Sequence, residues 1–284
     1  MDSPRVRDVV TACQRLWPTA WAEPWDSVGL AVGRPEAPVE AILCALDPVD
    51  AVIAEAREGG ADFLFTHHPL LLRGVTSVAA DTLKGGQVAE LIEAGIAAFN
   101  AHTNADSAVG GVSDVLADAI GLRERRPLAP TAGAPDGVGI GRAGALPEPL
   151  SVRQLAEALA EALAPTATGV RVAGDPEARV ETAAVLGGSG DSLFDEVRAA
   201  GSDVYITSDL RHHPASEARD TAHRGAGTPH LIDISHWAAE ALWLPRAAAQ
   251  LADALAGDGF AVRIELSAVR SDPWDLCIGQ PGFA

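Results

Sequence analysis

The sequence is poor in cysteine and has no long uninterrupted hydrophobic run. Its three cysteines, Cys13, Cys44 and Cys277, are odd in number and widely spaced, so neither a disulfide framework nor a zinc ribbon is indicated. No run approaches the roughly 20 apolar residues that span a bilayer, and the N-terminus lacks the basic start and apolar core of a signal peptide. These absences predict a soluble cytoplasmic protein.

Basic residues are also scarce. The chain has 21 Lys and Arg against 39 Asp and Glu, a formal net charge of −18. Because non-specific binding to nucleic acid or to an anionic membrane depends mainly on basic side chains, this balance argues against both partners. Hydrophobic residues make up 48% of the chain, which is typical of globular proteins, and 284 residues suffice for two α/β lobes with separate cores.

The chain is organised around residues 60–69, Gly-Ala-Asp-Phe-Leu-Phe-Thr-His-His-Pro. Only a few residues separate the glycine from the proline, so the apolar run predicts a short buried strand rather than a helix. Such a strand carries His67 and His68 to the edge of a sheet, where α/β proteins usually place their sites. Two neighbouring imidazoles on an extended backbone point in different directions and can serve two metal ions. The alternative is a solvated turn with two incidental histidines.

A second version of this stretch lies in the C-terminal half. Residues 201–207, Gly-Ser-Asp-Val-Tyr-Ile-Thr, match residues 60–66 position by position, and a second His-His-Pro follows at 212–214. An apolar run and a helical stretch precede each copy, at 39–46 and 51–58 in the first half and at 182–187 and 192–200 in the second. Self-similarity at one long period predicts two related half-domains facing each other, because solenoid repeats are far shorter.

Each half also contains a histidine followed four residues later by a carboxylate. The strand expected at 96–100 precedes His102 and Asp106, and a similar apolar run precedes His236 and Glu240. One helical turn places each pair on one face, and these side chains suit zinc, iron, nickel or manganese. One such pair alone is more often a surface ion pair. Three histidine-containing pairs at strand ends, arranged in a repeat, predict a metal centre.

Two other regions allow more than one interpretation. Residues 21–30, dense in Trp, Pro and Gly, are either a packed surface loop or a rim that shapes the site or a subunit contact. Residues 122–149, rich in Arg, Pro, Gly and Ala, are predicted to connect the lobes, although residues 137–141 are compatible with a strand that opens the second lobe. A helix is expected from the N-cap Ser151 to about Leu163.

In this order, the motifs resemble those of the Nif-three-like dinuclear metal protein family, also called GTP cyclohydrolase I type 2. The resemblance covers nearly all of the chain. It rests on Trp25-Asp26-Ser27-Val28-Gly29-Leu30, Thr66-His67-His68-Pro69, Ala101-His102-Thr103-Asn104-Ala105-Asp106, Gly187-Gly188-Ser189-Gly190, Thr207-Ser208-Asp209 and the segment from Asp233 through His236 to Glu240.

The resemblance implies two α/β lobes with two adjacent divalent metal ions per subunit in the cleft between them. The ligands it implies are His67, His68, Asp106, His236 and Glu240, with Glu240 bridging the ions. The expected lobes are residues 1–125, completed by the C-terminal segment 230–284, and residues 126–230. The family also implies a ring-like homohexamer. Residues 122–149 are too few for the inserted domain of its longer members, so the chain resembles the short form.

The activity implied by the resemblance is metal-dependent hydrolysis of the GTP cyclohydrolase type. Metal-activated water would attack the imidazole ring of guanine, and His102 would pass protons to the ring nitrogens. The alternatives are a two-metal phosphoester hydrolase and a non-enzymatic metal-binding scaffold or regulatory protein.

Four residues are candidates for substrate binding. Gly188 and Ser189 either cradle a phosphate on backbone N–H groups or form a tight turn. His212 and His213 either contact substrate or line the cleft. Two serines depart from the family pattern, since Ser208 and Ser235 stand where the family usually has glycine, and they bear on the shape of the pocket rather than on the ligands.

Overall fold

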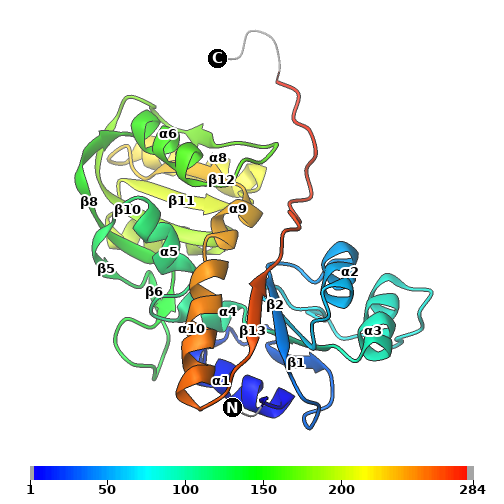
Figure 1. Cartoon of the computed structure of the whole chain (residues 1–284). Coiled ribbons are helices and arrows are strands. Elements are labelled where there is room, and N and C mark those ends of the chain that lie inside the picture. The colour runs from blue at the N-terminus through cyan, green and yellow to red at the C-terminus, as the bar shows by residue number, and fades with distance from the viewer. Residues whose placement is uncertain (1–2, 280–284) are drawn as a thin grey trace. The chain divides into compact units, whose positions relative to one another are not determined.

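The structure, a computed structural model that describes residues 3–279, contains two compact units (Figure 1). The first unit comprises the chain up to Ala108 together with Trp243–Ser271, and the second comprises Val109–Leu242 and the chain from Asp272. Each unit is a β-sheet flanked by helices, which confirms the α/β class.

The first unit is built on a five-stranded sheet of order β1-β4-β3-β2-β13, in which only β1 is antiparallel to its neighbour. Its strands are β1 (Gly29–Val32), β2 (Ala41–Ala45), β3 (Phe63–Thr66), β4 (Ala97–Asn100) and β13 (Arg263–Leu266). Its helices are α1 (Val6–Leu16), the 3₁₀ turn η1 (Thr19–Trp21), α2 (Asp50–Glu58), α3 (Leu83–Ala94), α4 (Thr103–Ser107) and α10 (Leu244–Gly257). The central strand β3 is buried along its whole length, as its apolar sequence predicts.

The second unit contains a six-stranded sheet of order β5-β8-β10-β11-β12-β9 and a small two-stranded sheet, β6-β7. Its strands are β5 (Arg123–Arg126), β6 (Ala129–Pro130), β7 (Gly139–Ile140), β8 (Arg142–Ser151), β9 (Arg171–Ala173), β10 (Arg179–Ser189), β11 (Val204–Ser208) and β12 (His230–Ile234). Its helices are α5 (Val112–Ala119), α6 (Val152–Ala162), the 3₁₀ turn η2 (Asp191–Leu193), α7 (Phe194–Ala200), α8 (His212–Arg224) and α9 (His236–Ala241).

The sequence repeat corresponds to one shared arrangement of strands. Parallel β2-β3-β4 in the first unit and parallel β10-β11-β12 in the second have the same order. The repeated aspartates also do the same work. Asp62 accepts hydrogen bonds from the backbone N–H of Glu40 and Ala41, and Asp203 accepts them from the backbone N–H of Glu181 and Thr182 near the start of β10. Each aspartate therefore ties the start of one strand to the next.

The predicted connector is the main difference from the sequence-based expectation. Residues 122–149 contain β5, β6, β7 and most of β8, and β8 pairs with both β5 and β10. The units divide at 108/109, ahead of α5, and at 242/243, after α9. Arg142, in this region, has a buried guanidinium that forms a bidentate ion pair with Asp114. Its Nε and Nη2 donate to Oδ1 and Oδ2 of Asp114, each at 2.8 Å.

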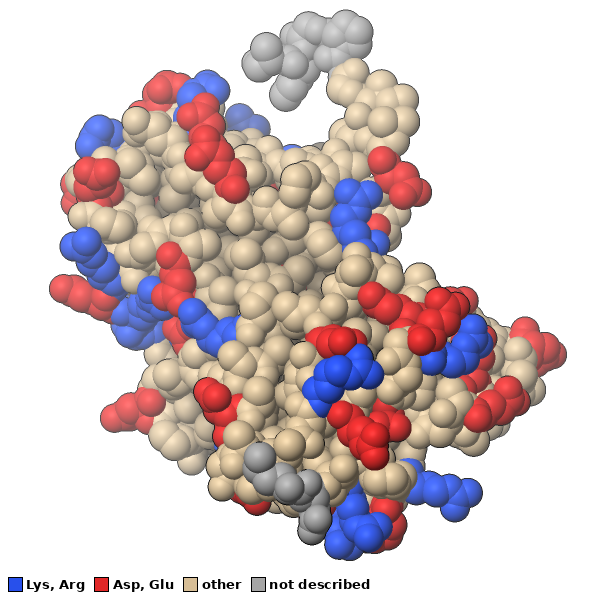
Figure 2. All heavy atoms as spheres, viewed as in Figure 1, with Lys and Arg blue, Asp and Glu red and all other residues tan. Residues whose placement is uncertain are grey.

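Charged side chains of both signs are interspersed on the face drawn in Figure 2. Within residues 3–279, no helix has both the length and the apolar character needed to cross a membrane.

The capping prediction for Ser151 is confirmed, since its hydroxyl accepts a hydrogen bond from the backbone N–H of Gln154.

Candidate metal centre

Two histidines leave the end of β3 in the first unit. The backbone N–H groups of His67 and His68 bond to the carbonyls of Ala45 and Leu46, so the chain continues alongside β2 after β3 ends. The His67 ring is fully buried and the His68 ring is 21% exposed. The strand therefore delivers both imidazoles to one edge of the sheet, as its sequence predicts.

Each imidazole of the first unit is held at Nδ1 by an acceptor. Nδ1 of His67 donates to the carbonyl of Ala101 at 2.9 Å, and Nδ1 of His68 donates to Asp47 at 2.6 Å. Nδ1 of His102 donates to Asp26 at 2.8 Å. Because all three partners are acceptors, the neutral form of each ring carries its proton on Nδ1 and its lone pair on Nε2. This arrangement, with a carbonyl or carboxylate behind the ring, is the one that metal-binding histidines almost always have.

These rings converge on one point. The ligand atoms of His67, His68 and His102 all lie within 4.8 Å of one another, and Asp106 Oδ1 lies 3.6 Å from His67 Nε2. The short helix α4 explains the position of Asp106, because His102 is its N-cap and Asp106 lies one turn later. The sequence-predicted residues of the first unit are thus brought together.

The Trp-Asp motif supports His102. Asp26 accepts hydrogen bonds from the His102 ring and from the backbone N–H and hydroxyl of Thr103. Burial alone would raise the pKa of Asp26, but these hydrogen bonds outweigh it and lower the pKa to about 2. Trp25 stands edge-on to the His102 ring, with ring centroids 5.9 Å apart. Of the two interpretations of this loop, the structure therefore favours a rim of the site.

The second unit holds a similar pair. In α9, His236 Nε2 lies 3.0 Å from Glu240 Oε1, and Nδ1 of His236 donates to Asp209 at 2.7 Å. Glu240 is buried. Gly188 makes room for it, because a Cβ at position 188 would lie 2.5 Å from Glu240 Oε1. The second glycine of the Gly-Gly-Ser-Gly motif, Gly188, is therefore required by the Glu240 carboxylate beside it.

The charges around His236 favour a cation. Burial alone would lower the pKa of His236, but Glu240 and Asp209 outweigh it and raise the pKa to about 11. In the metal-free protein the ring is thus a cation between two carboxylates. A divalent ion that bound Nε2 in place of this proton would also be attracted by the Glu240 carboxylate.

The residues of the first unit fit a divalent metal ion, and His236 and Glu240 of the second unit offer two more donors of the same kind. The donors are neutral imidazole and carboxylate, which suit zinc, iron, nickel and manganese. The 3.6 Å between His67 Nε2 and Asp106 Oδ1 also suits two ligands of one ion, because each bond is about 2.0–2.2 Å long.

Comparison with known proteins decides the family. Residues 4–273 match the family model described as Duf34/NIF3 (NGG1p interacting factor 3). The chain belongs to the Duf34/NIF3 family. A Streptomyces coelicolor protein named "GTP cyclohydrolase 1 type 2 homolog" is 53% identical over 272 residues, covering 95% of this chain and 94% of that protein. A Mycobacterium tuberculosis protein of the same name is 33% identical over 379 aligned positions, covering 96% and 97%.

Two solved structures have the same fold as this chain. The Staphylococcus aureus hypothetical protein SA1388 matches with a TM-score of 0.87 and 26% identity, over 97% of this chain and 100% of that chain. A Bacillus cereus protein related to NIF3 matches with a TM-score of 0.88 and 23% identity, over 98% and 100%. The alignment with the mycobacterial relative is longer than the 284 residues of this chain, so that relative contains additional residues, and this chain is a short member of the Duf34/NIF3 family.

The second His-His-Pro of this Duf34/NIF3 chain is not the structural counterpart of the first. Counting from the matched threonines, the positions of His67 and His68 are taken by Ser208 and Asp209. His212 and His213 instead form the exposed first turn of α8. Ser189 is exposed at the end of β10.

Three carboxylates behind the histidine rings were not among the predicted site residues: Asp26, Asp47 and Asp209. Asp26 and Asp209 lie within Duf34/NIF3 motifs, and Asp47 follows the apolar run of β2. An aspartate directly after a buried strand is the pattern that could have identified Asp47 and Asp209. Of the two serine departures, Ser235 caps α9, since its hydroxyl accepts from the Ala238 N–H.

Proposed function

We propose that this chain is a dinuclear divalent-metal protein with a hydrolytic activity of the GTP cyclohydrolase type. The proposed ligands are His67, His68, Asp106, His236 and Glu240. The observation that carries the proposal is the common state of four imidazoles: His67, His68, His102 and His236 each have Nδ1 hydrogen-bonded to a carbonyl or carboxylate. This orients Nε2 for metal binding or proton transfer.

Divalent ions held by these residues would supply a nucleophilic hydroxide near neutral pH by lowering the pKa of bound water. His102 is the proposed acid/base residue. Its Nε2 is the atom that would take up or deliver a proton, as general acid–base catalysis requires. The Asp26 carboxylate behind Nδ1 would hold the ring in place and stabilise its protonated form. Trp25 would restrict the motion of the ring from one side.

GTP is the proposed substrate because relatives that cover the chain carry the name "GTP cyclohydrolase 1 type 2 homolog". Ring opening needs proton transfer to ring nitrogens of guanine, and His102 offers one imidazole for that task. Gly188 and Ser189 remain the predicted contacts for the nucleotide, with His212 and His213. The homohexamer remains a prediction, for which sedimentation of the purified chain is the measurement.

The decisive experiment combines metal analysis with GTP turnover. The wild type, reconstituted with zinc, iron, manganese or nickel in turn, is expected to bind two ions per chain and to yield ring-opened product. Glu240→Ala is expected to lose metal and turnover and to remain folded. His102→Ala is expected to keep the metals and lose turnover by about 10²–10⁴-fold. The control is Glu161→Ala on the exposed side of α6, which should change neither quantity.

The outcomes separate the two parts of the proposal. Two bound ions without product would leave the metal centre in place and refute GTP as substrate, favouring another hydrolysed substrate or a non-enzymatic metal-binding role. Wild-type metal content in Glu240→Ala would refute the ligand assignment.

A further inference from the structure

Ser208 carries a buried hydroxyl that bonds to no protein group. It is the last residue of β11 and is fully buried. Among the residues that the structure describes, its Oγ has no hydrogen-bond partner. Burying a hydroxyl without a hydrogen bond costs free energy, and such groups are rare in native proteins. The packing of the second unit therefore does not account for this hydroxyl.

The position of Ser208 in the sheet shows which elements its side chain faces. β11 pairs with β12 in regular register as far as Ser208 and Ile234, so successive side chains alternate between the two faces. Val204 and Ile206 belong to the apolar cluster that also contains Ala238 of α9. Ser208, two residues after Ile206, points to this same face. Its hydroxyl therefore lies on the side of the sheet that α9 covers.

The Glu240 carboxylate lies on the same face, over the adjacent strand. A Cβ on Gly187 would lie 3.5 Å from Glu240 Cγ, and one on Gly188 would lie 2.5 Å from Oε1. The next residue of β10, Ser189, is the one that pairs with Ser208. Because neighbouring strands are only about 4.8 Å apart, the Ser208 hydroxyl comes next to the Glu240 carboxylate.

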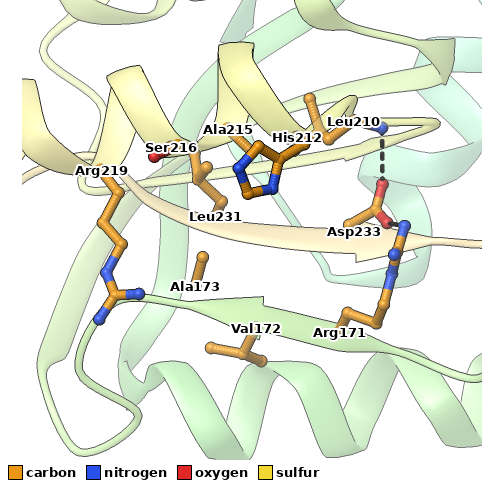
Figure 3. Close-up of a pocket in the computed structure, with 10 residues that line it drawn as sticks. All are labelled: Arg171, Val172, Ala173, Leu210, His212, Ala215, Ser216, Arg219, Leu231 and Asp233. Atoms are coloured by element: carbon orange, nitrogen blue, oxygen red, sulfur yellow. Dashed lines mark hydrogen bonds and ion pairs between the residues drawn. The ribbon is translucent and has the colours of Figure 1, made fainter.

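The chain directly after Ser208 is held in place. Asp209 has a φ of +55°, and its carboxylate accepts a hydrogen bond from Nδ1 of His236 at 2.7 Å. The backbone N–H of Leu210 donates to Asp233 at 3.2 Å, which Figure 3 shows at one end of a groove of about 410 Å³. These contacts fix the end of β11, so the hydroxyl is presented from a rigid element.

A carboxylate that binds a metal ion needs a group to orient it. His236 Nε2 and Glu240 Oε1 are 3.0 Å apart, a separation that suits two ligands of one ion, because each bond is about 2.0–2.2 Å long. Carboxylates that bind a metal are in turn hydrogen-bonded, and these partners fix their orientation. Serine suits this task because its hydroxyl is a neutral donor that rotates toward an acceptor.

We propose that Ser208 is the hydrogen-bond donor that holds the Glu240 carboxylate when a divalent ion binds His236 and Glu240. The inference rests on the proposed role of Glu240 as a ligand. Ser208 acts through Glu240 and touches neither ion nor substrate, so it is a positioning residue. While His236 and Glu240 pair with each other, the hydroxyl stays unbonded, and turning both side chains to the ion gives it an acceptor.

Zinc binding to the metal-free protein tests this role without GTP, by competition with a chromophoric chelator. Ser208→Ala is expected to lower the zinc affinity by about 10–100-fold, as is typical for groups that orient a ligand. The control is Ser113→Ala. Ser113 is also fully buried, and its Oγ likewise has no hydrogen-bond partner within residues 3–279. It lies on α5, one turn before Ala117 of the apolar cluster, so its substitution should leave the zinc affinity unchanged.

Urea unfolding of the metal-free proteins separates a positioning role from a structural one. Both substitutions remove a hydroxyl that is unbonded in the metal-free protein. Both variants should therefore unfold at a urea concentration equal to or above that of the wild type. A lower midpoint for Ser208→Ala would show that its hydroxyl is already bonded without metal and would overturn the proposal.

The zinc titrations also distinguish this inference from the proposed function. A zinc affinity that falls in Ser208→Ala but not in Ser113→Ala would support the inference whether or not GTP is the substrate. Equal affinities in the two variants would overturn it and leave the proposed ligands in place. A wild type that binds no zinc would refute the metal centre and the role of Ser208 together.

Discussion

Gly188→Ala is expected to weaken metal binding far more than it weakens the fold. Gly188 has a φ of +82°, and a Cβ there would lie 2.5 Å from Glu240 Oε1. Ordinary contact begins at about 3.4 Å, so the carboxylate would have to retreat by roughly 0.9 Å. The backbone cost of an alanine in this left-handed conformation is about 1–2 kcal/mol. Because the carboxylate is the end of a side chain, its retreat costs the fold little but removes it from its position beside His236.

Gly201→Ala is the matched control for this prediction. Gly201 has a φ of +69°, and nothing lies within 4 Å of the position that a Cβ would take there. It imposes a similar backbone cost without displacing a carboxylate. Urea unfolding of the metal-free proteins should therefore show a similar loss for both variants. Metal titration should show a loss of about 10–100-fold for Gly188→Ala and none for Gly201→Ala. Equal metal affinities in the two variants would refute the role assigned to Gly188.

Two further predictions concern buried carboxylates. Asp26→Asn should reduce the free energy of unfolding by about 2–2.5 kcal/mol near neutral pH, since the pKa of Asp26 falls from 3.8 to about 2 on folding. This contribution is present above pH 3.8 and lost as the pH falls through about 2. The difference in free energy of unfolding between wild type and variant, measured by urea unfolding, should therefore shrink on acidification. A difference independent of pH would contradict the pKa argument. Asp114→Ala should reduce the free energy of unfolding by about 3–5 kcal/mol, because it leaves the buried Arg142 charge without its carboxylate. The control, Glu177→Ala, breaks the exposed ion pair with Arg153 and should reduce it by at most about 1 kcal/mol. Equal losses in the two variants would count against the contribution of the buried ion pair.

The repeated core of the fold was predictable because its pattern is local. The buried strands β3 and β11 are continuous apolar runs between a glycine and a threonine, and short runs bounded by turn residues predict strands. The histidines at the end of β3, and the helical spacing of His236 and Glu240, also follow from short segments. These features required no knowledge of distant contacts.

The predicted connector was wrong because β8 does not have a strand-like sequence. It contains Gly144, Pro147 and Pro149, residues that are depleted in strands. Its pairing with β5 and β10 and the anchoring of Arg142 by Asp114 nevertheless hold it in the sheet. Tertiary contacts thus override the local preference.

The supporting carboxylates could not be assigned for a related reason. Asp26 lies 76 residues from His102, the ring that it holds. The His-His-Pro of the second half matches the first in sequence but not in position. Its sequence matches the first copy, but four additional residues separate it from the matched threonine, so the strand end is occupied by Ser208 and Asp209.

The division of the first unit into two chain segments has a consequence for synthesis. The β13 strand, which pairs with β2, and α10, which packs on α1, come from the last part of the chain. During translation the second unit's residues Val109–Leu242 emerge as one continuous block, whereas β2 must wait with an open edge until Arg263–Leu266 leave the ribosome. Since unpaired strand edges promote aggregation, the nascent first unit is exposed to aggregation for as long as β2 lacks its partner strand.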